Sequence, residues 1–557
     1  MMGSQDDQRL PYCVVDLEQR VPANHPLRLI RRAVDFSFVR AEVAPFYGYN
    51  GNESVDPEVI LKLLFLLFLD DLPSERELMR QVAYRLDYLW FLGMSLNDEV
   101  PDHSVLSKAR ARWGGAVFEK LFVRTVRQCV EAGLVDGRKV HLDASVVDAD
   151  AARNAVLKGS PQMVAALKDA YARQEAKLAE TRGRRRARRP RLRDDRMPAG
   201  AEDVAAADPQ ESARQEPNVA EQESSETIVP PEPAAESSAI PASIGPGEAA
   251  AKPKVKVNDA LVCRTDPDAA VTRHAPNCKS GARPRYMSHR AVDDLAGVIT
   301  AVASTPGDAN EGALMIDLLA QHEFTTDRQV EVAVADSKYG TIENYLACED
   351  HGIQPHMADL NRKQANTGRR AGIFPDADFA YDAATDTYRC PAGQQLQPAR
   401  HHTKRRSIDY TAAPGVCAAC PLKAQCTRSK TGRSIKRHDR QRTIDRARAQ
   451  ARSPAARRDR RRRMHLMEGS FADAAENHGL KRSRWRRLWR QRIQDTLIAA
   501  VQNVRILAGI SRGRGRKAGR LPRRRRPLVG TTFTTRRTGA ARDRRVGYRV
   551  PSGKRDE

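Results

Sequence analysis

Val332-Ala-Val-Ala-Asp336-Ser-Lys-Tyr-Gly340 is the most informative stretch of this chain for its fold. Its small apolar residues predict a short buried strand that ends at the carboxylate of Asp336. An earlier stretch, Val140-His-Leu-Asp143-Ala-Ser145, has the same design, an apolar run that ends at an acid. Ligand clefts in open α/β folds form at the carboxyl ends of strands, so we expect Asp143 and Asp336 at the edge of one sheet.

A third acid lies on a different kind of element. Glu468 occurs in Met-His-Leu-Met-Glu-Gly-Ser-Phe, within an arginine-flanked stretch that predicts a helix. Cutting and joining phosphodiesters requires an activated oxygen nucleophile and a stabilised leaving oxygen, and two divalent ions held by carboxylates supply both. Asp143, Asp336 and Glu468 are therefore candidate metal-binding catalytic residues. Asp148 and Asp150 are rival ligands, and three of 70 acidic residues can equally be ordinary solvated side chains.

The segments around these acids predict an α/β core with a mixed sheet. We expect strands at 139–147, 286–292, 298–303, 330–335 and 353–358, and helices at 311–322 and 342–350. Asp293-Asp-Leu-Ala-Gly297, between the second and third strands, predicts a hairpin turn. Strands and helices in this succession form a layered fold, and their order resembles that of ribonuclease H-like nucleases.

Residues 12–135 predict an all-α N-terminal domain. Asp56-Pro57 supplies an N-cap and a proline at the first helical position, and Ser74–Glu77 has the pattern of a capping box. A third helix is expected at Val105–Trp113. Its basic side chains are Lys108, Arg110 and Arg112. Short helices with a basic last member are typical of helix-turn-helix DNA readers, and a helical packing or dimerisation domain is the alternative.

The composition divides the rest of the chain. Residues 197–257 are rich in Ala, Glu, Ser and Pro without any aromatic residue, and burial there cannot offset chain entropy, so we expect disorder. We also expect the Arg/Gly/Pro-rich stretch 511–557 to be disordered. The predicted division is a helical DNA-binding domain (1–135), the first part of the core (136–157), a helical then disordered insertion (158–260), the second part of the core (261–374), a cysteine-rich insertion (375–440), the Glu468 helix with basic C-terminal helices (441–510) and the tail (511–557).

The net charge of +25 and the pI near 9.9 exceed what solubility requires. Each Lys or Arg that neutralises a phosphate releases counterions, so the surplus favours DNA as a partner, although a basic tail on a neutral protein is the alternative. The runs Arg457–Arg463 and Lys481–Arg492 are the densest in charge. Candidate contacts to the DNA backbone are Lys481, Arg482 and Arg484. Trp485 and Trp489 can stack on bases or pack in the core.

Nine unevenly spread cysteines do not fit a secreted disulfide framework. Four of them have the ligand count of a structural Cys₄ zinc site: Cys390, Cys417, Cys420 and Cys426. Reduced inert thiols and redox pairing are the alternatives, and His401 or His402 can replace a ligand. The chain begins without a signal-peptide pattern, and its most apolar stretch, Val59–Leu69, contains Lys62 and is too short for a membrane span. We therefore expect a cytoplasmic protein without membrane contact.

Ordered blocks along the chain carry a family likeness. They are Val55-Asp-Pro-Glu, Trp90-Phe-Leu-Gly, Val100-Pro-Asp-His-Ser, Leu142-Asp-Ala-Ser, Thr265-Asp-Pro-Asp-Ala, Thr305-Pro-Gly-Asp-Ala, Ala335-Asp-Ser-Lys-Tyr-Gly, Glu468-Gly-Ser-Phe-Ala-Asp-Ala, Asn477-His-Gly-Leu and Gln502-Asn-Val-Arg. With these blocks the chain resembles bacterial insertion-sequence transposases of the DDE type, over roughly residues 12–170 and 260–510. Such proteins combine a helical transposase domain with a ribonuclease H-like core.

The resemblance implies that Asp143, Asp336 and Glu468 form the catalytic triad and hold two Mg²⁺ or Mn²⁺ ions. It further implies that water frees a 3′-hydroxyl at a transposon end and that this hydroxyl then attacks target DNA. Joining two ends implies a homodimer or higher oligomer on DNA, in the nucleoid of a bacterial cytoplasm. Family members commonly carry a basic residue seven positions after the glutamate, where this chain has Ala475. A catalytically inactive, transposase-derived DNA-binding protein is therefore the alternative.

Overall fold

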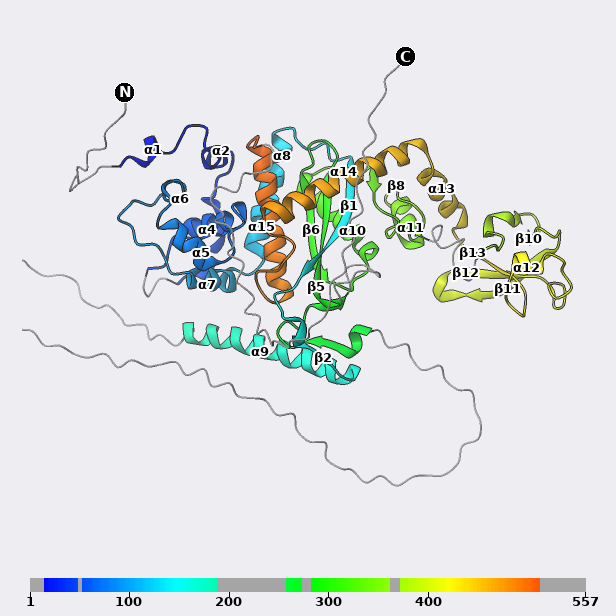
Figure 1. Ribbon diagram of the computed structural model, residues 1–557. Coiled ribbons are helices and arrows are strands. Elements are labelled where there is room, and N and C mark those ends of the chain that lie inside the picture. The colour runs from blue at the N-terminus through cyan, green and yellow to red at the C-terminus, as the bar shows by residue number, and fades with distance from the viewer. Residues whose placement is uncertain (1–14, 49–52, 188–256, 273–281, 361–370, 511–557) are drawn as a thin grey trace, which may run out of the picture. The chain divides into compact units, whose positions relative to one another are not determined.

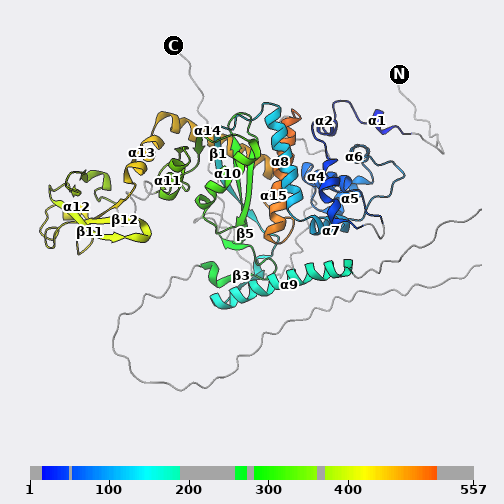
Figure 2. The same cartoon turned by 180° about the vertical axis from the view of Figure 1, so that it is seen from behind.

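The computed structural model describes residues 15–48, 53–187, 257–272, 282–360 and 371–510. A mixed sheet is central to the fold (Figures 1 and 2). β1 (Lys139–Asp148) pairs antiparallel with β5 (Arg283–Asp293) on one side and parallel with β7 (Val332–Val334) on the other. Beyond these, β8 (Gln354–His356) is parallel to β7, while β6 (Ile299–Pro306) and β4 (Ala270–Thr272) are antiparallel to β5. The mixed α/β core predicted from the sequence is confirmed.

The predicted hairpin and helices of this core lie close to their expected bounds. Asp293 donates its N–H to the carbonyl of Val298 at 2.9 Å, and Gly297 takes the left-handed conformation that closes the turn. The helical elements that follow are η4 (Glu311–Leu314), α10 (Met315–Thr326) and α11 (Ile342–Asp350). Side chains of α10 and α11 pack with Val140 and Leu142 in one buried cluster, so these helices cover one face of the sheet.

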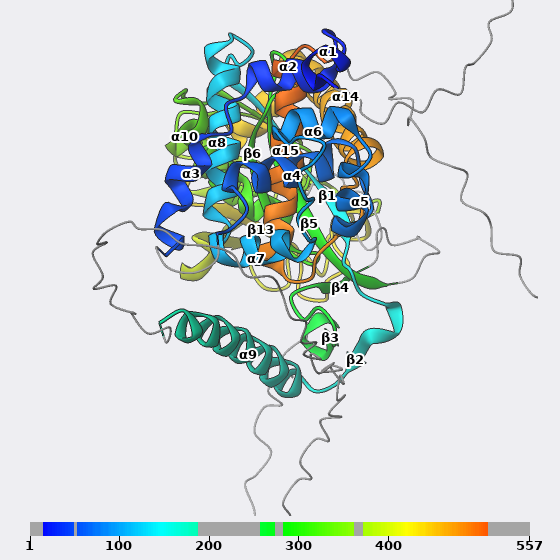
Figure 3. The ribbon, with the colours of Figure 1, turned by 90° about the vertical axis from the view of Figure 1, so that its left-hand side faces the viewer.

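The N-terminal region is helical, as expected (Figure 3). Its elements are α1 (Leu17–Arg20), α2 (Pro26–Ala33), α3 (Phe38–Val43), η1 (Ala44–Phe46), α4 (Pro57–Leu69), α5 (Glu75–Val82), α6 (Leu86–Leu92), α7 (Ser104–Trp113) and α8 (Ala116–Glu131). The Asp56 carboxylate caps α4 through the N–H of Glu58, and the Ser74 hydroxyl caps α5 through the N–H of Glu77. Because α4 is buried on nearly all sides, it forms the centre of this region.

The helix α15 (Leu488–Leu507) joins the N-terminal region to the sheet. It packs against α8, α4 and β6, and every residue from Ile493 to Val504 is buried. Asn503 bonds both backbone groups of Ile299 on β6, at 2.9 and 2.7 Å. One apolar cluster therefore runs from the N-terminal helices through α15 to the second face of the sheet.

Asp495 of α15 is a fully buried acid whose ionisation opposes folding. Burial raises its pKa to about 6. The hydrogen bond from the Ser304 hydroxyl and the charge of Arg290 lower the pKa, but by less. An exposed Asp titrates near about 3.9, so the folded state holds this proton more tightly than the unfolded chain does. The stability due to Asp495 is therefore fully present below about pH 4 and is lost as the pH rises through about 6.

We expect Asp495→Asn to make the free energy of unfolding less dependent on pH. Measured by denaturant unfolding, the variant should gain about 1–3 kcal/mol relative to the unsubstituted chain between pH 4.5 and pH 7.5, since one pKa unit corresponds to about 1.4 kcal/mol. Parallel pH profiles for the two chains would contradict this assignment.

The cysteine-rich insertion contains a separate antiparallel sheet, which the sequence interpretation did not predict. Its strands are β9 (Ala380–Asp382), β10 (Thr387–Arg389), β11 (Gln395–His402), β12 (Ser407–Thr411) and β13 (Ser434–His438), with the short helical elements η7 (Asp376–Asp378), η8 (Thr403–Arg405) and α12 (Lys423–Cys426). The rings of three of its tyrosines, Tyr381, Tyr388 and Tyr410, meet edge-on or tilted, with centroids 5.0–6.3 Å apart. This aromatic cluster supplies a core that is too small to be recognised from periodicity.

The insertion predicted at residues 158–260 leaves the central sheet and returns to it at one place. β2 (Val156–Lys158) and β3 (Leu261–Cys263) form an antiparallel pair, flanked by η2 (Arg153–Ala155) and η3 (Val257–Ala260), and α9 (Pro161–Ala187) follows β2. The two ends of the insertion therefore lie side by side. The segments predicted to be disordered, 197–257 and 511–557, lie outside the described residues apart from Val257. Two further helices, α13 (Gln441–Ala451) and α14 (Pro454–Asn477), precede α15.

Candidate active site

The parallel pairing of β1 and β7 places two of the predicted acids at one edge of the sheet. The register ends at the pair His141 and Val334. Asp143 and Asp336 each follow two residues later. Burial raises the pKa of Asp143, Arg463 opposes the shift, and the negative charge of Asp336 adds to it. The structure therefore brings Asp143 and Asp336 onto neighbouring strands, although Asp143 lies within β1 and not at its end, because β1 continues to Asp148 in pairing with β5.

A further acid, Glu311, joins this pair and was missed in the sequence. It lies in η4 with its side chain nearly buried, only 9% of the residue being exposed. Burial raises its pKa, Lys338 opposes the shift, and the charges of Asp336 and Asp143 add to it. The available signal was an acid next to the Thr305-Pro-Gly-Asp-Ala block, but no periodicity distinguishes Glu311 from other acids.

The loop from Asp336 to Gly340 is tightly packed. Tyr339 is completely buried, and its hydroxyl has no hydrogen-bond partner among the described residues. Burial raises the pKa of Tyr339, and the charges of Glu311, Asp143 and Asp336 raise it further. A Cβ on Gly340 would lie 2.0 Å from the carbonyl oxygen of Ala358, so only glycine fits there. The hydroxyl is therefore a buried polar atom that no described residue bonds, and the charges of three carboxylates act on it.

Basic side chains and a backbone N–H group bind the carboxylates of Asp143, Glu311 and Asp336. Arg463 Nη1 lies 2.6 Å from Asp143 Oδ2, the Lys338 ammonium pairs with Glu311, and Asp336 Oδ1 accepts the Lys338 N–H at 2.8 Å. Within the described ranges no three acidic, His or Cys side chains are already arranged around a metal position. Each carboxylate is instead turned toward its own partner.

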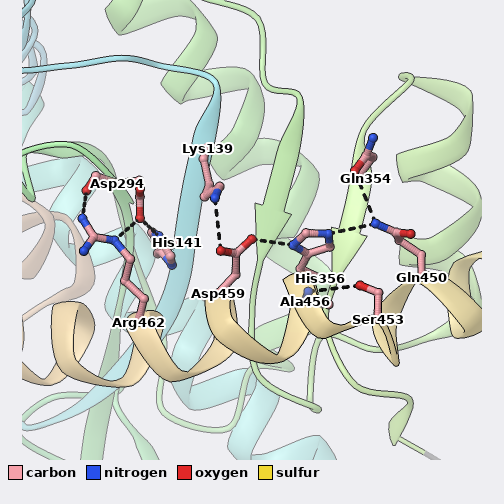
Figure 4. Close-up of polar contacts among 10 residues, drawn as sticks. All are labelled: Lys139, His141, Asp294, Gln354, His356, Gln450, Ser453, Ala456, Asp459 and Arg462. Carbon is pink, nitrogen blue, oxygen red and sulfur yellow. Dashed lines mark hydrogen bonds and ion pairs between the residues drawn. The ribbon is translucent and has the colours of Figure 1, made fainter.

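A row of polar contacts fixes α14 along β1 (Figure 4). Lys139 Nζ lies 3.1 Å from Asp459, whose other oxygen lies 2.7 Å from His356 Nδ1 on β8. His141 Nε2 lies 2.7 Å from Asp294, which also pairs with Arg462. Alternate residues of a strand share one face, so the same face of β1 that presents Asp143 binds the helix carrying Glu468.

Glu468 lies on α14 between two of its anchor points. Arg463 contacts Asp143, and the backbone and hydroxyl of Ser470 accept bonds from Arg290, the register partner of Asp143 on β5. The Glu468 side chain is exposed, and no ion pair joins it to another described residue. It lies about 140° around the helix from Arg463. The structure therefore places Glu468 along the helix at the level of Asp143, with no contact between the two carboxylates.

The candidate DNA-binding side chains divide into buried and exposed sets. Arg110 is 4% exposed, pairs with Glu75 and lies over the Trp485 ring at 3.9 Å. Arg484 pairs with Asp71 at 2.9 Å and is also largely buried. Both guanidinium groups join the segment before α15 to the N-terminal helices. The exposed candidates are Lys108, Arg112, Lys481 and Arg482.

Two of the exposed candidates lie next to β1. Lys481 Nζ donates to the Ser145 hydroxyl at 2.6 Å, and Arg482 pairs with Asp150 at 3.3 Å. Ser145 is two residues beyond Asp143 and faces the same way. Lys481 thus adds a positive charge near the candidate site that Ala475, half-buried on α14, does not supply. Asp148, the first rival ligand, is instead paired with Arg283 and Arg285.

Trp485 packs in the core, one of the two expected alternatives. Its ring meets Phe68 edge-on with centroids 5.6 Å apart, and Arg110 covers it. Trp489 is partly buried against the same core cluster.

The four cysteines of the predicted zinc site are brought together. Cys390, Cys417, Cys420 and Cys426 all line one pocket. Burial raises the pKa of the Cys426 thiol, against the opposing charge of Arg433. However, no group of three or more ligand side chains in the described part of the chain is arranged to hold a metal, so the predicted zinc site is not found. His402 is instead paired with Asp409 at 3.0 Å.

Comparison with known families decides the identity. The model of a family described as Transposase domain (DUF772) matches residues 15–112, and that of the Transposase DDE domain matches residues 389–508. The chain belongs to the insertion-sequence DDE transposases. The first match spans α1 to α7 of this transposase, and the second contains Glu468. No curated protein and no solved structure matches the transposase.

Asp143 and Asp336 lie between the two matched regions of the transposase, so their assignment rests on strand pattern and geometry. Among the described residues, no helix has both the length and the apolar character that a bilayer crossing demands.

Proposed function

We propose that this transposase cleaves DNA at the ends of its insertion sequence and joins them to target DNA, with Asp143, Asp336 and Glu468 as its metal-binding catalytic residues. The observation that carries the proposal is the parallel register of β1 and β7, which sets two carboxylates side by side at a sheet edge. The position of Glu468 on a helix anchored at the level of Asp143 supports the third assignment.

The oxygen atoms at this edge of the sheet are of the kind that bind divalent ions. DDE transposases generally use divalent metal ions, and carboxylate oxygens are preferred ligands of Mg²⁺ and Mn²⁺. The buried Tyr339 hydroxyl is an additional oxygen without a partner among the described residues. When bound, two such ions would activate the attacking oxygen and stabilise the leaving oxygen. Asp143 must first exchange the Arg463 guanidinium for metal, so Arg463 holds the carboxylate in the metal-free protein.

The core we propose is ribonuclease H-like. Its support is the strand succession β6, β5, β1, β7 and β8, in which β5 is antiparallel to both β6 and β1, while β1, β7 and β8 are parallel to one another. This arrangement agrees with the element order expected from the sequence.

Positive side chains beside β1 would hold the DNA backbone. Phosphate contacts of this kind position the duplex without reading its sequence. Lys481 and Arg482 lie on the segment after α14, next to Ser145 and Asp150. The basic side chains of α7, Lys108 and Arg112, are exposed in the helical domain and form a second candidate contact. Joining two ends would require at least two copies of the chain on DNA.

Arg482→Ala is expected to weaken DNA binding and to reduce the slope of log K against log salt by about 1, the value for one lost phosphate contact. Fluorescence anisotropy across a salt series measures both quantities. Arg138→Ala is a matched control, because Arg138 is also exposed and paired with an acid but precedes β1 instead of following it. Equal slopes for the two variants would remove Arg482 from the interface.

The test of the proposed function is strand cleavage. The purified full-length chain should cut DNA carrying the inverted ends that flank its gene and should do so only with Mg²⁺ or Mn²⁺ present. Strand transfer into a second duplex should follow from the freed 3′-hydroxyl. Specific binding of these ends without cleavage would favour the second candidate, an inactive transposase-derived DNA-binding protein. Ala475, in place of the basic residue expected there, is the observation that favours this second candidate.

A further inference from the structure

We infer that Glu311 is a further ligand of the metal centre at Asp143 and Asp336. This inference rests on the proposed function and extends it from three carboxylates to four. Neither matched region includes Glu311, and the sequence pattern did not single it out.

Backbone packing fixes Glu311 beside the Asp336 loop. A Cβ on Gly312 would lie 2.9 Å from the carbonyl oxygen of Lys338, so the two backbones are in close contact. Asn344 ties them together, because its Nδ2 donates to the carbonyls of Gly312 and Tyr339, each at 2.9 Å. Asn310 caps η4 through the N–H of Gly312 at 3.2 Å. The position of Glu311 is therefore set by contacts other than its own ion pair.

The Tyr339 hydroxyl is independent evidence that this site binds a ligand. Its side chain is fully buried, and no described residue bonds the hydroxyl. Buried polar atoms are almost always satisfied, so an orphan hydroxyl requires an explanation. The charges that act on it most strongly are those of Glu311, Asp143 and Asp336. A cation with its water shell at this position would satisfy both the hydroxyl and the carboxylates.

Lys338 is the counter-ion of Glu311 in the metal-free protein. Its side chain is 57% exposed, whereas that of Glu311 is 10% exposed. The lysine can therefore leave toward solvent while the carboxylate stays in place. Exchange of this ammonium for a divalent cation would keep the buried charge compensated, which a buried carboxylate requires.

The experiment measures Mn²⁺ binding to the full-length chain by calorimetry and by the electron paramagnetic resonance signal of free Mn²⁺. Glu311→Gln is expected to lower Mn²⁺ affinity at least about tenfold, since even groups that only support a ligand contribute about 10–100-fold. Glu311→Asp, which keeps the carboxylate, should lose less. Glu343→Gln is the matched control, because Glu343 is an exposed acid on the neighbouring helix α11.

Lys338→Met supplies a second measurement in a chain with Glu311 intact. It should raise Mn²⁺ affinity, and this gain should disappear in the double variant with Glu311→Gln. Unchanged affinity in Glu311→Gln, or equal gains from Lys338→Met in both backgrounds, would overturn the inference. If Asp336→Asn also left Mn²⁺ affinity unchanged, the proposed metal centre itself would fail. Should Glu311→Gln not fold, Glu311→Asp and Lys338→Met still decide the question.

Discussion

Asp336→Asn is expected to abolish Mg²⁺-dependent cleavage of the insertion-sequence ends, with a fall of about 10³-fold or more. The amide keeps the size of the side chain and can still accept the Lys338 N–H, whose distance to Asp336 is now 2.8 Å. It removes the negative charge that a divalent ion requires. Transition-state stabilisation by such ions amounts to several kcal/mol, and each 1.36 kcal/mol is tenfold in rate. Single-turnover cleavage of labelled end DNA measures the effect.

Asp317→Asn is the matched control for this substitution. Asp317 lies in the first turn of α10, where its side chain is exposed. The same chemical change there should leave cleavage within about twofold, because exposed substitutions away from a site have small effects. End binding should survive in both variants, since phosphate contacts dominate affinity. Equal cleavage rates for Asp336→Asn and the unsubstituted chain would contradict the assignment of the catalytic triad.

Gly340→Ala is expected to destabilise the protein by about 3 kcal/mol, at the upper end of the range for overpacking. The new Cβ would lie 2.0 Å from the Ala358 carbonyl oxygen and 2.8 Å from its carbon, both backbone atoms. Movement is opposed because the Gly340 carbonyl accepts the N–H of Leu360 at 3.0 Å. The strain falls on the loop that carries Asp336. The rate of cleavage should therefore also fall by about 10²-fold, because a displacement of about 1 Å at a reacting group can reduce the rate by that factor.

Gly48→Ala serves as the control for backbone substitution. A Cβ there meets no heavy atom within 4 Å, and the residue has no left-handed conformation. Its free energy of unfolding should change by less than about 0.5 kcal/mol. Denaturant unfolding of the two variants compares them directly. If Gly340→Ala lowers the free energy of unfolding no more than Gly48→Ala does, the predicted strain in the Asp336 loop is contradicted.

The elements of the sheet core could be predicted because their patterns are local. Val332–Val334 is an apolar run that precedes Asp336, Lys139–Asp148 contains an apolar run around Asp143, and Asp293–Gly297 has turn residues that close a hairpin. The sheet of the cysteine-rich insertion was missed because its strands are short and mostly exposed. Its core depends on ring contacts among Tyr381, Tyr388 and Tyr410, which lie on separate strands.

The burial of charged side chains could not be predicted from the sequence. Arg110 belongs to a basic run that reads as a DNA contact, yet it faces Glu75 and Trp485 inside the protein. Arg290 lies in an ordinary strand pattern, but it is fully buried and bonds Ser470 and Gln502 on two helices. In each case the partner is distant along the chain, and local periodicity carries no information about it.

Neighbouring residues alone predict the strand that contains Asp143, the strand that precedes Asp336, the helix that carries Glu468 and the basic character of the protein. The folded structure was needed to show which further side chains lie beside these two acids. It added Glu311 and the unsatisfied Tyr339 hydroxyl, and it paired Asp143 with Arg463. These contacts join residues up to 320 positions apart, and they arise from the parallel register of β1 and β7 and from the packing of α14 across them.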